Sequence, residues 1–391
     1  MSPDNFLSIY IHIPFCIRKC RYCDFYSIPF DVSLVYRYIE ALGKEWEMYE
    51  SNPLIKEKTV YTIYIGGGTP SILDIQMWKK LDEALFSKIN MSDVKEWSLE
   101  CNPESFSIEK GEMYADTGVT RLTFGVQSLN RRELSICGRA HSADRALETL
   151  NDSGLDGLFN SIGVDLIYSL PGQTPETLDN TLSKVFSVPI IKHLSAYELT
   201  IAQDTTFGRH SKRLPVPSEE LSVQMYELIG KRCNRRGMRQ YEISNYAMPG
   251  YESLHNKAYW SHKPYIGLGA SAHSYIHPKR WSNAADAESY ISKIFDGRSA
   301  VNFEETLGPL EIAAEMIFLG LRSEGGINEK EFAAHTGIEF YADGREKMLD
   351  EYSSSGFLEK RDGIWIPSPK GMLFADMMAR GLIPRKKNHT A

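Results

Sequence analysis

The sequence predicts an α/β protein: an incomplete (β/α) TIM-type barrel, followed by a small, mainly helical, winged-helix-like domain. Two observations predict this fold. Over residues 8–243, segments rich in β-branched and aromatic residues alternate with amphipathic segments, which is typical of a parallel sheet with helices outside it. From residue 305 the pattern changes to helices around one short hairpin, as in a winged-helix domain.

The elements of the barrel follow from local composition and spacing. Strands are expected where β-branched and aromatic residues cluster: 8–13, 60–65, 97–101, 121–126, 163–167, 193–199 and 240–243. Helices are expected where apolar residues recur at helical spacing, and several begin with capping residues such as Thr174 and Ser218. The expected helices are 33–50, 74–88, 107–117, 131–153, 175–187 and 218–236.

Residues 244–304 interrupt this alternation. They are rich in aromatic residues, glycine and histidine, which suits a lid or connecting region rather than a further βα unit. The predicted organisation is therefore a barrel core over 1–243, a lid over 244–304 and a winged-helix-like domain over 305–391. Within the last, helices at 310–321, 328–336, 343–355 and 369–380 surround a hairpin that turns at Asp362-Gly363.

Charge and hydropathy exclude several classes of function. The 391 residues include 44 basic and 51 acidic side chains, a net charge of −7, which argues against nucleic acid as a partner of the whole protein. Residues 305–391 hold 11 basic and 14 acidic side chains, so the winged-helix-like domain is not expected to bind DNA either. We find no signal-peptide pattern and no apolar run long enough to span a bilayer, so a cytoplasmic location is expected.

Three cysteines, Cys16, Cys20 and Cys23, form a C-x3-C-x2-C run directly after the first predicted strand. Thiolates crowded into one loop are typical of a soft metal centre. Structural zinc usually takes four ligands, often as two separated pairs, and a redox C-x-x-C pair would leave Cys16 unused. An iron–sulfur cluster is therefore favoured, and three ligands on a cubane leave one iron open. The other cysteines are expected to be small buried residues: Cys101, Cys137 and Cys233.

Polar and glycine residues stand at the ends of the next four predicted strands. The glycine-rich stretch 66–70 follows the second strand, and Glu100, Gln127 and Asp165 stand at the third, fourth and fifth. Each alone is explained by a tight turn or a helix cap. Because the carboxyl ends of barrel strands converge on one mouth, together they indicate a single site. Glycine there would let the backbone approach a ligand closely.

These motifs resemble those of a known family. The stretch 10–15, Tyr-Ile-His-Ile-Pro-Phe, with the cysteine run after it, resembles radical S-adenosylmethionine (SAM) proteins. Within them it resembles the oxygen-independent coproporphyrinogen III dehydrogenase-like family. Further matching motifs follow in order along nearly the whole chain: Gly66–Pro70, Glu100-x-Asn102-Pro103, Gly125-Val126-Gln127-Ser128, Gly138-Arg139-x-His141 and the stretch from Asp165 to Gln173.

The resemblance implies a set of cofactors and ligands. It implies a 4Fe–4S cluster with Cys16, Cys20 and Cys23 as metal ligands, and SAM chelating the open iron, with chemistry that belongs to the cofactor. Carboxylates suit ribose hydroxyls, and an arginine suits a carboxylate. The implied SAM contacts are Tyr10, Tyr22, Gly66, Gly67, Gly68, Thr69, Glu100, Gln127, Arg139 and Asp165.

Two features resemble the heme chaperone branch of this family. The porphyrinogen-oxidising branch has another cysteine two positions after the third, where this chain has Phe25. The motif His255-Asn-x-x-Tyr259-Trp260 is the second feature, and in that branch its histidine is linked to heme binding. A neutral imidazole is a common axial ligand of heme iron, and the aromatic rings can pack on the porphyrin edge. A histidine that hydrogen-bonds within a lid explains His255 equally well, and His273 is a weaker alternative.

The expected function is that of a heme chaperone, which binds the cluster, SAM and heme and delivers heme to apo-proteins such as respiratory enzymes. One alternative is an enzyme of porphyrin biosynthesis that decarboxylates the propionates of coproporphyrinogen III. Another is a radical SAM enzyme acting on a different substrate. Whether SAM is cleaved, whether the chain forms a homodimer and whether it contacts membrane proteins transiently all stay open at this stage.

Overall fold

The computed structural model describes residues 5–342 and 344–383, so the basic residues 385–387 lie outside it. Within that part of the chain, one twelve-stranded sheet runs in the order β14-β13-β12-β11-β1-β4-β5-β6-β7-β8-β10-β9. Its strands are β1 (Phe6–Ile13), β4 (Thr59–Gly67), β5 (Glu96–Cys101), β6 (Arg121–Gln127), β7 (Ser161–Tyr168), β8 (Ile191–Glu198), β9 (Arg239–Gln240), β10 (Asn245–Ala247), β11 (Tyr265–Leu268), β12 (His273–Ile276), β13 (Lys279–Asn283) and β14 (Val301–Thr306).

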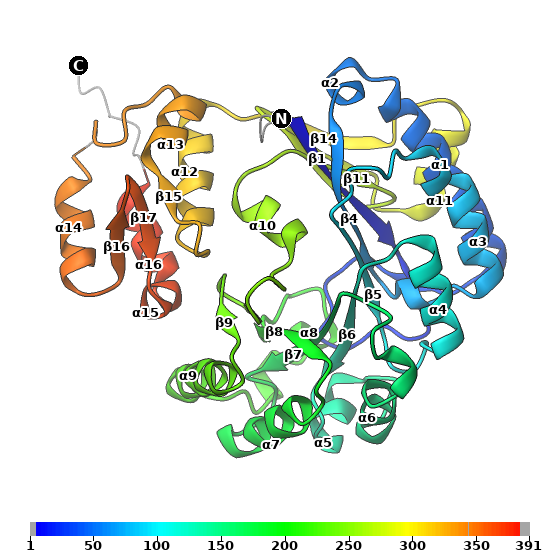
Figure 1. The fold of residues 1–391 in the computed structure, drawn as a ribbon, viewed down its shortest axis with the longest axis horizontal. Coiled ribbons are helices and arrows are strands. Elements are labelled where there is room, and N and C mark those ends of the chain that lie inside the picture. The colour runs from blue at the N-terminus through cyan, green and yellow to red at the C-terminus, as the bar shows by residue number, and fades with distance from the viewer. Residues whose placement is uncertain (1–4, 343, 384–391) are drawn as a thin grey trace.

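Helices cover the outer face of the parallel strands (Figure 1). Those between the strands are α1 (Val32–Glu50), α2 (Pro53–Lys56), α3 (Ile75–Ala84), α4 (Ile108–Thr117), α5 (Arg131–Cys137), α6 (Ala143–Leu150), α7 (Pro175–Phe186), α8 (Thr206–Arg209), α9 (Glu219–Arg235), α10 (Leu254–Trp260) and α11 (Ala287–Phe295). Strands β1, β4, β5, β6, β7 and β8 pair in parallel, each with the next. The sheet stays open because its edge strands, β9 and β14, do not pair with each other. The predicted incomplete barrel is therefore confirmed.

The interior of the barrel is polar. On β1, Ile9 and Ile11 are buried in the main hydrophobic core, while the alternate residues Ser8, Tyr10 and His12 lie on the other face, as strand geometry requires. The same alternation recurs along the other parallel strands. Closed barrels usually fill this space with layers of branched apolar side chains. A polar interior is instead suited to holding a ligand.

Several predicted elements are shorter or divided. The predicted helix 131–153 is two helices, α5 and α6, because Gly138 takes a left-handed conformation (φ 72°) and ends α5. The predicted helix 369–380 divides at Phe374 into α15 (Pro369–Leu373) and α16 (Ala375–Leu382). Of the predicted strand 240–243, the structure keeps only β9, which pairs antiparallel with β10.

The stretch 244–304 contributes strands that its sequence did not predict. Strand β11 lies parallel to β1, with Tyr10 opposite Gly267, and β12, β13 and β14 continue the sheet in antiparallel fashion. With only four residues in a glycine-rich context, β11 is too short to show a strand periodicity. Helix α10, between β10 and β11, lies between the strands and the C-terminal helices (Figure 1).

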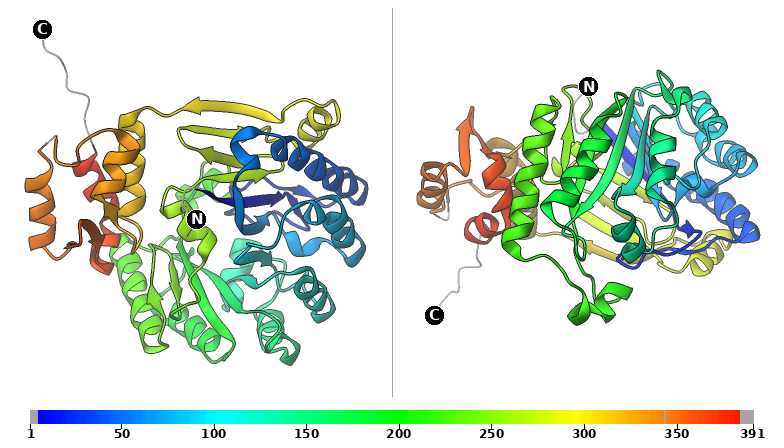
Figure 2. Two further views of the ribbon diagram at one scale, coloured as in Figure 1. Left: turned by 45° about the horizontal axis from the view of Figure 1, so that its top comes forward. Right: turned by 90° about the horizontal axis from the view of Figure 1, so that it is seen from below.

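The C-terminal domain has the winged-helix order of elements. Strand β14 leads across to it (Figure 2), and it contains α12 (Pro309–Gly320), β15 (Ile327–Asn328), α13 (Glu329–Thr336), α14 (Glu346–Ser354), β16 (Leu358–Arg361) and β17 (Ile364–Pro367). Its hairpin turns at Asp362 and Gly363, both at positive φ, which is the backbone of a two-residue type I′ turn. A separate hydrophobic cluster, which includes Phe332, Leu349 and Trp365, holds the domain together.

A buried carboxyl group joins α1 to the late strands. Glu45 accepts hydrogen bonds from the Tyr290 hydroxyl (2.7 Å), the Gly269 backbone N–H (2.8 Å) and the Asn283 amide (2.6 Å). Burial nevertheless raises the pKa of Glu45 to about 7. The folded state therefore binds a proton that the unfolded state has lost between the ordinary pKa of 4.5 and about 7.

This proton gives a testable pH dependence. The unfolding free energy should fall by up to about 3 kcal/mol as pH rises from about 4.5 to about 7, and then level off. Glu45→Gln should remove this pH dependence of the unfolding free energy. The stability of the variant relative to wild type should therefore rise between about pH 5 and about pH 8. Urea unfolding of both proteins at the two pH values measures the difference. A constant difference at both values would contradict the raised pKa of Glu45.

Candidate functional site

The cysteine loop, residues 16–27, is closed by two short strands. Strand β2 (Phe15–Cys16) pairs in parallel with β3 (Ile28–Pro29), so the loop starts and ends beside the end of β1. Cys16, Cys20 and Cys23 are half-buried free thiols in this loop. Burial raises the pKa of the Cys16 thiol, and raises that of Cys23 to about 11. Among the described residues, no three His, Cys, Asp or Glu side chains converge on a site for a single metal ion.

The glycine-rich loop at the end of β4 packs tightly on the chain itself. Gly67 has a φ of 113°, and a Cβ there would lie 2.6 Å from the His12 ring. A Cβ on Gly68 would lie 2.8 Å from the Pro14 backbone, and one on Gly66 would lie 3.0 Å from the Glu100 carboxyl. The chain's own atoms therefore give a reason for glycine at Gly67 and Gly68 that is independent of a ligand, while close approach of Gly66, Gly67 and Gly68 to a ligand stays a prediction.

Two half-buried carboxyl groups, Glu100 and Asp165, lie on β5 and β7. Glu100 accepts from the Tyr64 hydroxyl (2.8 Å) and from the Gly67 backbone N–H (3.2 Å). Burial, and then the nearby charge of Asp165, raise the pKa of Glu100 to about 7. Burial likewise raises the pKa of Asp165 to about 6. Within the described chain, Oδ1 of Asp165 is buried without a hydrogen-bond partner.

Arg139 connects the cysteine loop to the strand ends. Its Nη1 donates to the Cys20 sulfur (3.3 Å), and its Nη2 donates to Asn102 Oδ1 and to the Gly125 carbonyl, both at 2.7 Å. Asn102 in turn donates to the Thr69 hydroxyl (3.1 Å), which itself donates to the Cys16 sulfur (3.5 Å). The Arg139 Nε is buried and has no partner among the described residues. Cysteines and strand ends thus form one connected polar network.

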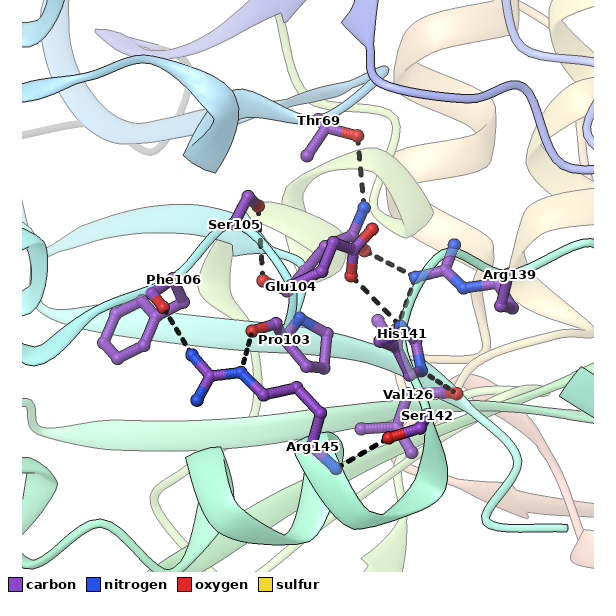
Figure 3. Close-up of polar contacts among 12 residues, drawn as sticks. Thr69, Pro103, Glu104, Ser105, Phe106, Val126, Arg139, His141, Ser142 and Arg145 are labelled. Atoms are coloured by element: carbon purple, nitrogen blue, oxygen red, sulfur yellow. Dashed lines mark hydrogen bonds and ion pairs between the residues drawn. The ribbon is translucent and has the colours of Figure 1, made fainter. Parts of the chain in front are cut away.

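A second group of hydrogen bonds, around His141 and Arg145, lies next to this network and supports it (Figure 3). His141 lies 3.1 Å from both Glu104 Oε2 and the Val126 carbonyl. Arg145 donates to the Pro103 carbonyl (3.1 Å) and to that of Phe106. Sequence reasoning missed Glu104 and Arg145, because a carboxylate in a loop and an arginine in a helix carry no specific signal by themselves.

The three remaining predicted SAM contacts, Tyr10, Gln127 and Tyr22, lie in different surroundings. The Tyr10 hydroxyl lies 3.0 Å from His12 Nδ1, inside the barrel. Gln127 ends β6 with a φ of 66°. Tyr22 packs against the Phe207 ring, with centroids 6.5 Å apart, in a small apolar cluster with Cys137. The structure therefore brings Tyr10 into one cavity with Gly67 and Glu100. Tyr22 instead packs in an apolar cluster, where burial raises its pKa, and lies close enough to Arg139 and Cys20 for their charges to affect that pKa as well.

His255 is fully buried on α10. Its Nδ1 lies 2.8 Å from the Thr62 hydroxyl, and its Nε2 lies 2.9 Å from the Tyr259 hydroxyl. Burial lowers the pKa of His255 to about 3. The carboxylate of Glu96 accepts the backbone N–H groups of Leu254 and His255 (2.9 and 3.1 Å), which fixes the start of α10. The exposed His273 lies on β12.

A cavity of about 1030 Å³ joins these parts. Its wall includes Asp24 and Phe25 of the cysteine loop, the strand-end residues Tyr10, Gly67 and Glu100, both His255 and Tyr259 of α10, and Glu315 and Phe318 of α12. Residues that sequence reasoning did not single out also line it: Tyr64, His262, Tyr265, Tyr275, Arg280, Glu315 and Phe318. They come from segments far apart in the chain, so no local pattern could have found them.

Helix α12 is held over this cavity by a charged group. Arg280 donates to Glu315 (2.5 Å) and also pairs with Glu305, and His262 Nε2 lies 3.1 Å from Glu315. The C-terminal domain thereby forms one wall of the cavity.

No described helix is both long and apolar enough to cross a membrane.

Comparisons with known proteins follow this division of the chain. The profile of the radical SAM superfamily matches residues 10–185, and that of the HemN C-terminal domain matches residues 307–374. A protein of Bacillus subtilis (strain 168) named heme chaperone HemW is 36% identical over 333 residues, which cover 84% of this chain and 87% of the relative. The chain belongs to the HemW family of radical SAM proteins. The resemblance seen in the cysteine motif and at Phe25 is thereby confirmed.

Other members and neighbours agree with this assignment. The heme chaperone HemW of Lactococcus lactis subsp. lactis (strain IL1403) is 35% identical over 327 residues, covering 83% of this chain and 84% of the relative. The structure of coproporphyrinogen III oxidase (HemN) from Escherichia coli, described as a radical SAM enzyme, has a TM-score of 0.82 at 22% identity. The structural match covers 98% of this chain and 91% of the HemN chain. This likeness shows the shared fold.

Radical SAM proteins, to which the HemW family belongs, imply a 4Fe–4S cluster and SAM. The residues present suit both groups. Three free thiols in one loop supply soft ligands for separate irons of a cubane. Arg139 Nε and Asp165 Oδ1 are buried and have no hydrogen-bond partner in the part of the chain that the structure describes, so a bound polar ligand would satisfy them. When bound and reduced, these groups supply radical chemistry that belongs to the cofactor.

Proposed function

We propose that this HemW-family chain binds a 4Fe–4S cluster, SAM and heme, and delivers heme to apo-proteins such as respiratory enzymes. One observation carries the proposal. A cavity of about 1030 Å³, lined by tyrosines and histidines, adjoins the cysteine loop in a chain whose relatives are named heme chaperones. This volume is at the upper end of the range of roughly 300–1,000 Å³ for small-molecule pockets, and suits a ligand as large as a porphyrin.

The cluster and SAM bind at the cysteine loop and the neighbouring parallel strands in this proposal. Cys16, Cys20 and Cys23 hold the cluster, and Arg139 orients Cys20 by its 3.3 Å hydrogen bond. The proposed SAM contacts come from the parallel strands β1, β4, β5, β6 and β7, from the loop after β4 and from the loop between α5 and α6. They are Tyr10, Gly66, Gly67, Gly68, Thr69, Glu100, Gln127, Arg139 and Asp165. Tyr22, in its apolar cluster, contributes by packing the loop that carries the cysteines.

Heme occupies the part of the cavity between α10 and α12. The rings of Tyr259, Tyr265 and Phe318 line this part and offer flat apolar surface to a porphyrin. Lys263 and Arg280 line the same cavity, and cations of this kind attract the two propionates of heme. His255 is the proposed axial ligand, since a buried neutral imidazole is already in the form that binds iron.

His255→Ala is expected to lower heme affinity at least tenfold, because the axial bond to iron is lost. The measurement is a heme titration of the full chain followed by the Soret band. His210→Ala is the matched control, since His210 is exposed and its ring bonds to the Thr206 carbonyl one turn earlier, and it should bind heme like wild type. Unchanged binding in His255→Ala would remove the proposed role from this residue.

The enzyme alternative is tested on the same preparation. Reconstituted protein is incubated anaerobically with SAM, a chemical reductant and coproporphyrinogen III. We expect no protoporphyrinogen, because Phe25 stands where the oxidising branch has a further cysteine. Formation of protoporphyrinogen would contradict a chaperone-only function.

A further inference from the structure

Both ring nitrogens of His255 are engaged inside the protein. Nδ1 lies 2.8 Å from the Thr62 hydroxyl and Nε2 lies 2.9 Å from the Tyr259 hydroxyl. The Tyr259 ring meets the imidazole edge-on, with centroids 4.8 Å apart. The residue is 0% exposed. A ligand that is to bind this histidine must therefore first displace one of these partners.

Thr62 determines which nitrogen carries the proton. The Thr62 hydroxyl donates to Ser8 Oγ (2.8 Å), so its oxygen is left to accept a hydrogen bond from Nδ1–H. The lone pair of the neutral imidazole then lies on Nε2, where it accepts the Tyr259 O–H.

The nitrogen that Tyr259 occupies is the one available to iron. Metal ligation by histidine uses the lone pair of the unprotonated nitrogen, while the other nitrogen donates to a protein acceptor. Thr62 already provides that acceptor. Tyr259 follows His255 by four positions on α10, so both side chains lie on one face of the helix, and both line the cavity.

We infer that Tyr259 is a latch on His255: its hydroxyl holds Nε2 in the heme-free state, releases it when heme binds, and occupies it again when heme leaves. The inference rests on the proposed function and adds its regulation. The latch lowers heme affinity by the cost of breaking one buried hydrogen bond. A carrier gains from this competition, because an internal group that replaces iron favours transfer of the cargo over permanent capture.

The test compares two substitutions on opposite sides of the same ring. Tyr259→Phe removes the competitor and should tighten heme binding about tenfold, with slower transfer to excess apo-myoglobin. Thr62→Val removes the acceptor of Nδ1–H and should weaken heme binding, because the ring loses the support that orients it. Heme titration and transfer kinetics of the full chain measure both. A purely structural role would weaken binding in both variants, so tighter binding in Tyr259→Phe alone is the signature of the latch.

Two further variants distinguish a failure of the latch from a failure of the proposed function. Tyr290→Phe is the matched control, because it also loses a buried tyrosine hydroxyl bond, to Glu45 (2.7 Å), at a site outside the cavity, and it should bind heme like wild type. His255→Ala in the Tyr259→Phe background should lose the gain. If wild type binds no heme, the proposed function fails. If wild type binds heme through His255 but Tyr259→Phe binds no tighter, the function stands and the latch is wrong.

Discussion

Cys20→Ser is expected to abolish the iron–sulfur chromophore of the anaerobically reconstituted protein. Cys20 is one of three thiols in the cysteine loop, and its sulfur also accepts the hydrogen bond of Arg139. A serine hydroxyl is a hard, weakly acidic ligand, so two thiolates alone would have to hold the cubane. Visible absorbance and the iron content per chain measure the result.

The matched control for this experiment is Cys233→Ser. Cys233 is a buried cysteine on α9, in the main hydrophobic core and outside the cysteine loop. This variant should retain full iron, although its buried hydroxyl will cost some stability. A Cys20→Ser protein with wild-type iron content would contradict the ligand assignment.

Gly67→Ala is expected to destabilise the folded chain by about 2–4 kcal/mol and to abolish SAM binding. The new Cβ would lie 2.6 Å from the His12 ring. That ring cannot easily move aside, because its Nε2 donates to the Tyr26 carbonyl (2.9 Å) and the Tyr10 hydroxyl contacts its Nδ1. Gly67 also has a φ of 113°, which L-residues rarely adopt. Urea unfolding of the cluster-free protein and SAM binding to the reconstituted protein measure the two effects.

Gly172→Ala separates backbone strain from crowding. Gly172 also has a positive φ, of 75°, but nothing lies within 4 Å of its Cβ position. Its substitution should cost only the strain of a left-handed alanine, about 1–2 kcal/mol, and should leave SAM binding intact. If Gly67→Ala costs no more than Gly172→Ala, contact with His12 does not explain the glycine.

The parallel strands and most helices could be predicted from sequence because their signals are local. A buried strand such as β7 and a capped helix such as α7 each carry their own pattern. The partner of β1 could not be predicted in the same way. Strand β11 is four residues long and pairs with β1 across some 250 residues of chain, and only the folded sheet brings them together.

The candidate site likewise has a part that the sequence could propose and a part that only the folded structure shows. The cysteine run is a short, specific motif, and the strand-end residues carry a signal only as a set, so the sequence could propose them as one site because they recur in order along the chain. His255 was different, because its sequence allowed both a ligand and a hydrogen-bonded lid residue. The structure shows that it is hydrogen-bonded at both nitrogens, and the wall formed by Glu315 and Phe318 depends on how the C-terminal domain packs.

The pairing of β1 on both edges has a consequence for the order of events during biosynthesis. β1 leaves the ribosome well before its second edge can be completed, because that edge pairs with β11, residues 265–268, some 250 residues later in the chain. Until then β1 lacks half of its sheet partners, and the cysteine loop that follows it has no finished support. We therefore expect cluster insertion to follow translation of most of the chain. A nascent chain that stalls before β11 should accept no stable cluster, whatever the supply of iron and sulfide.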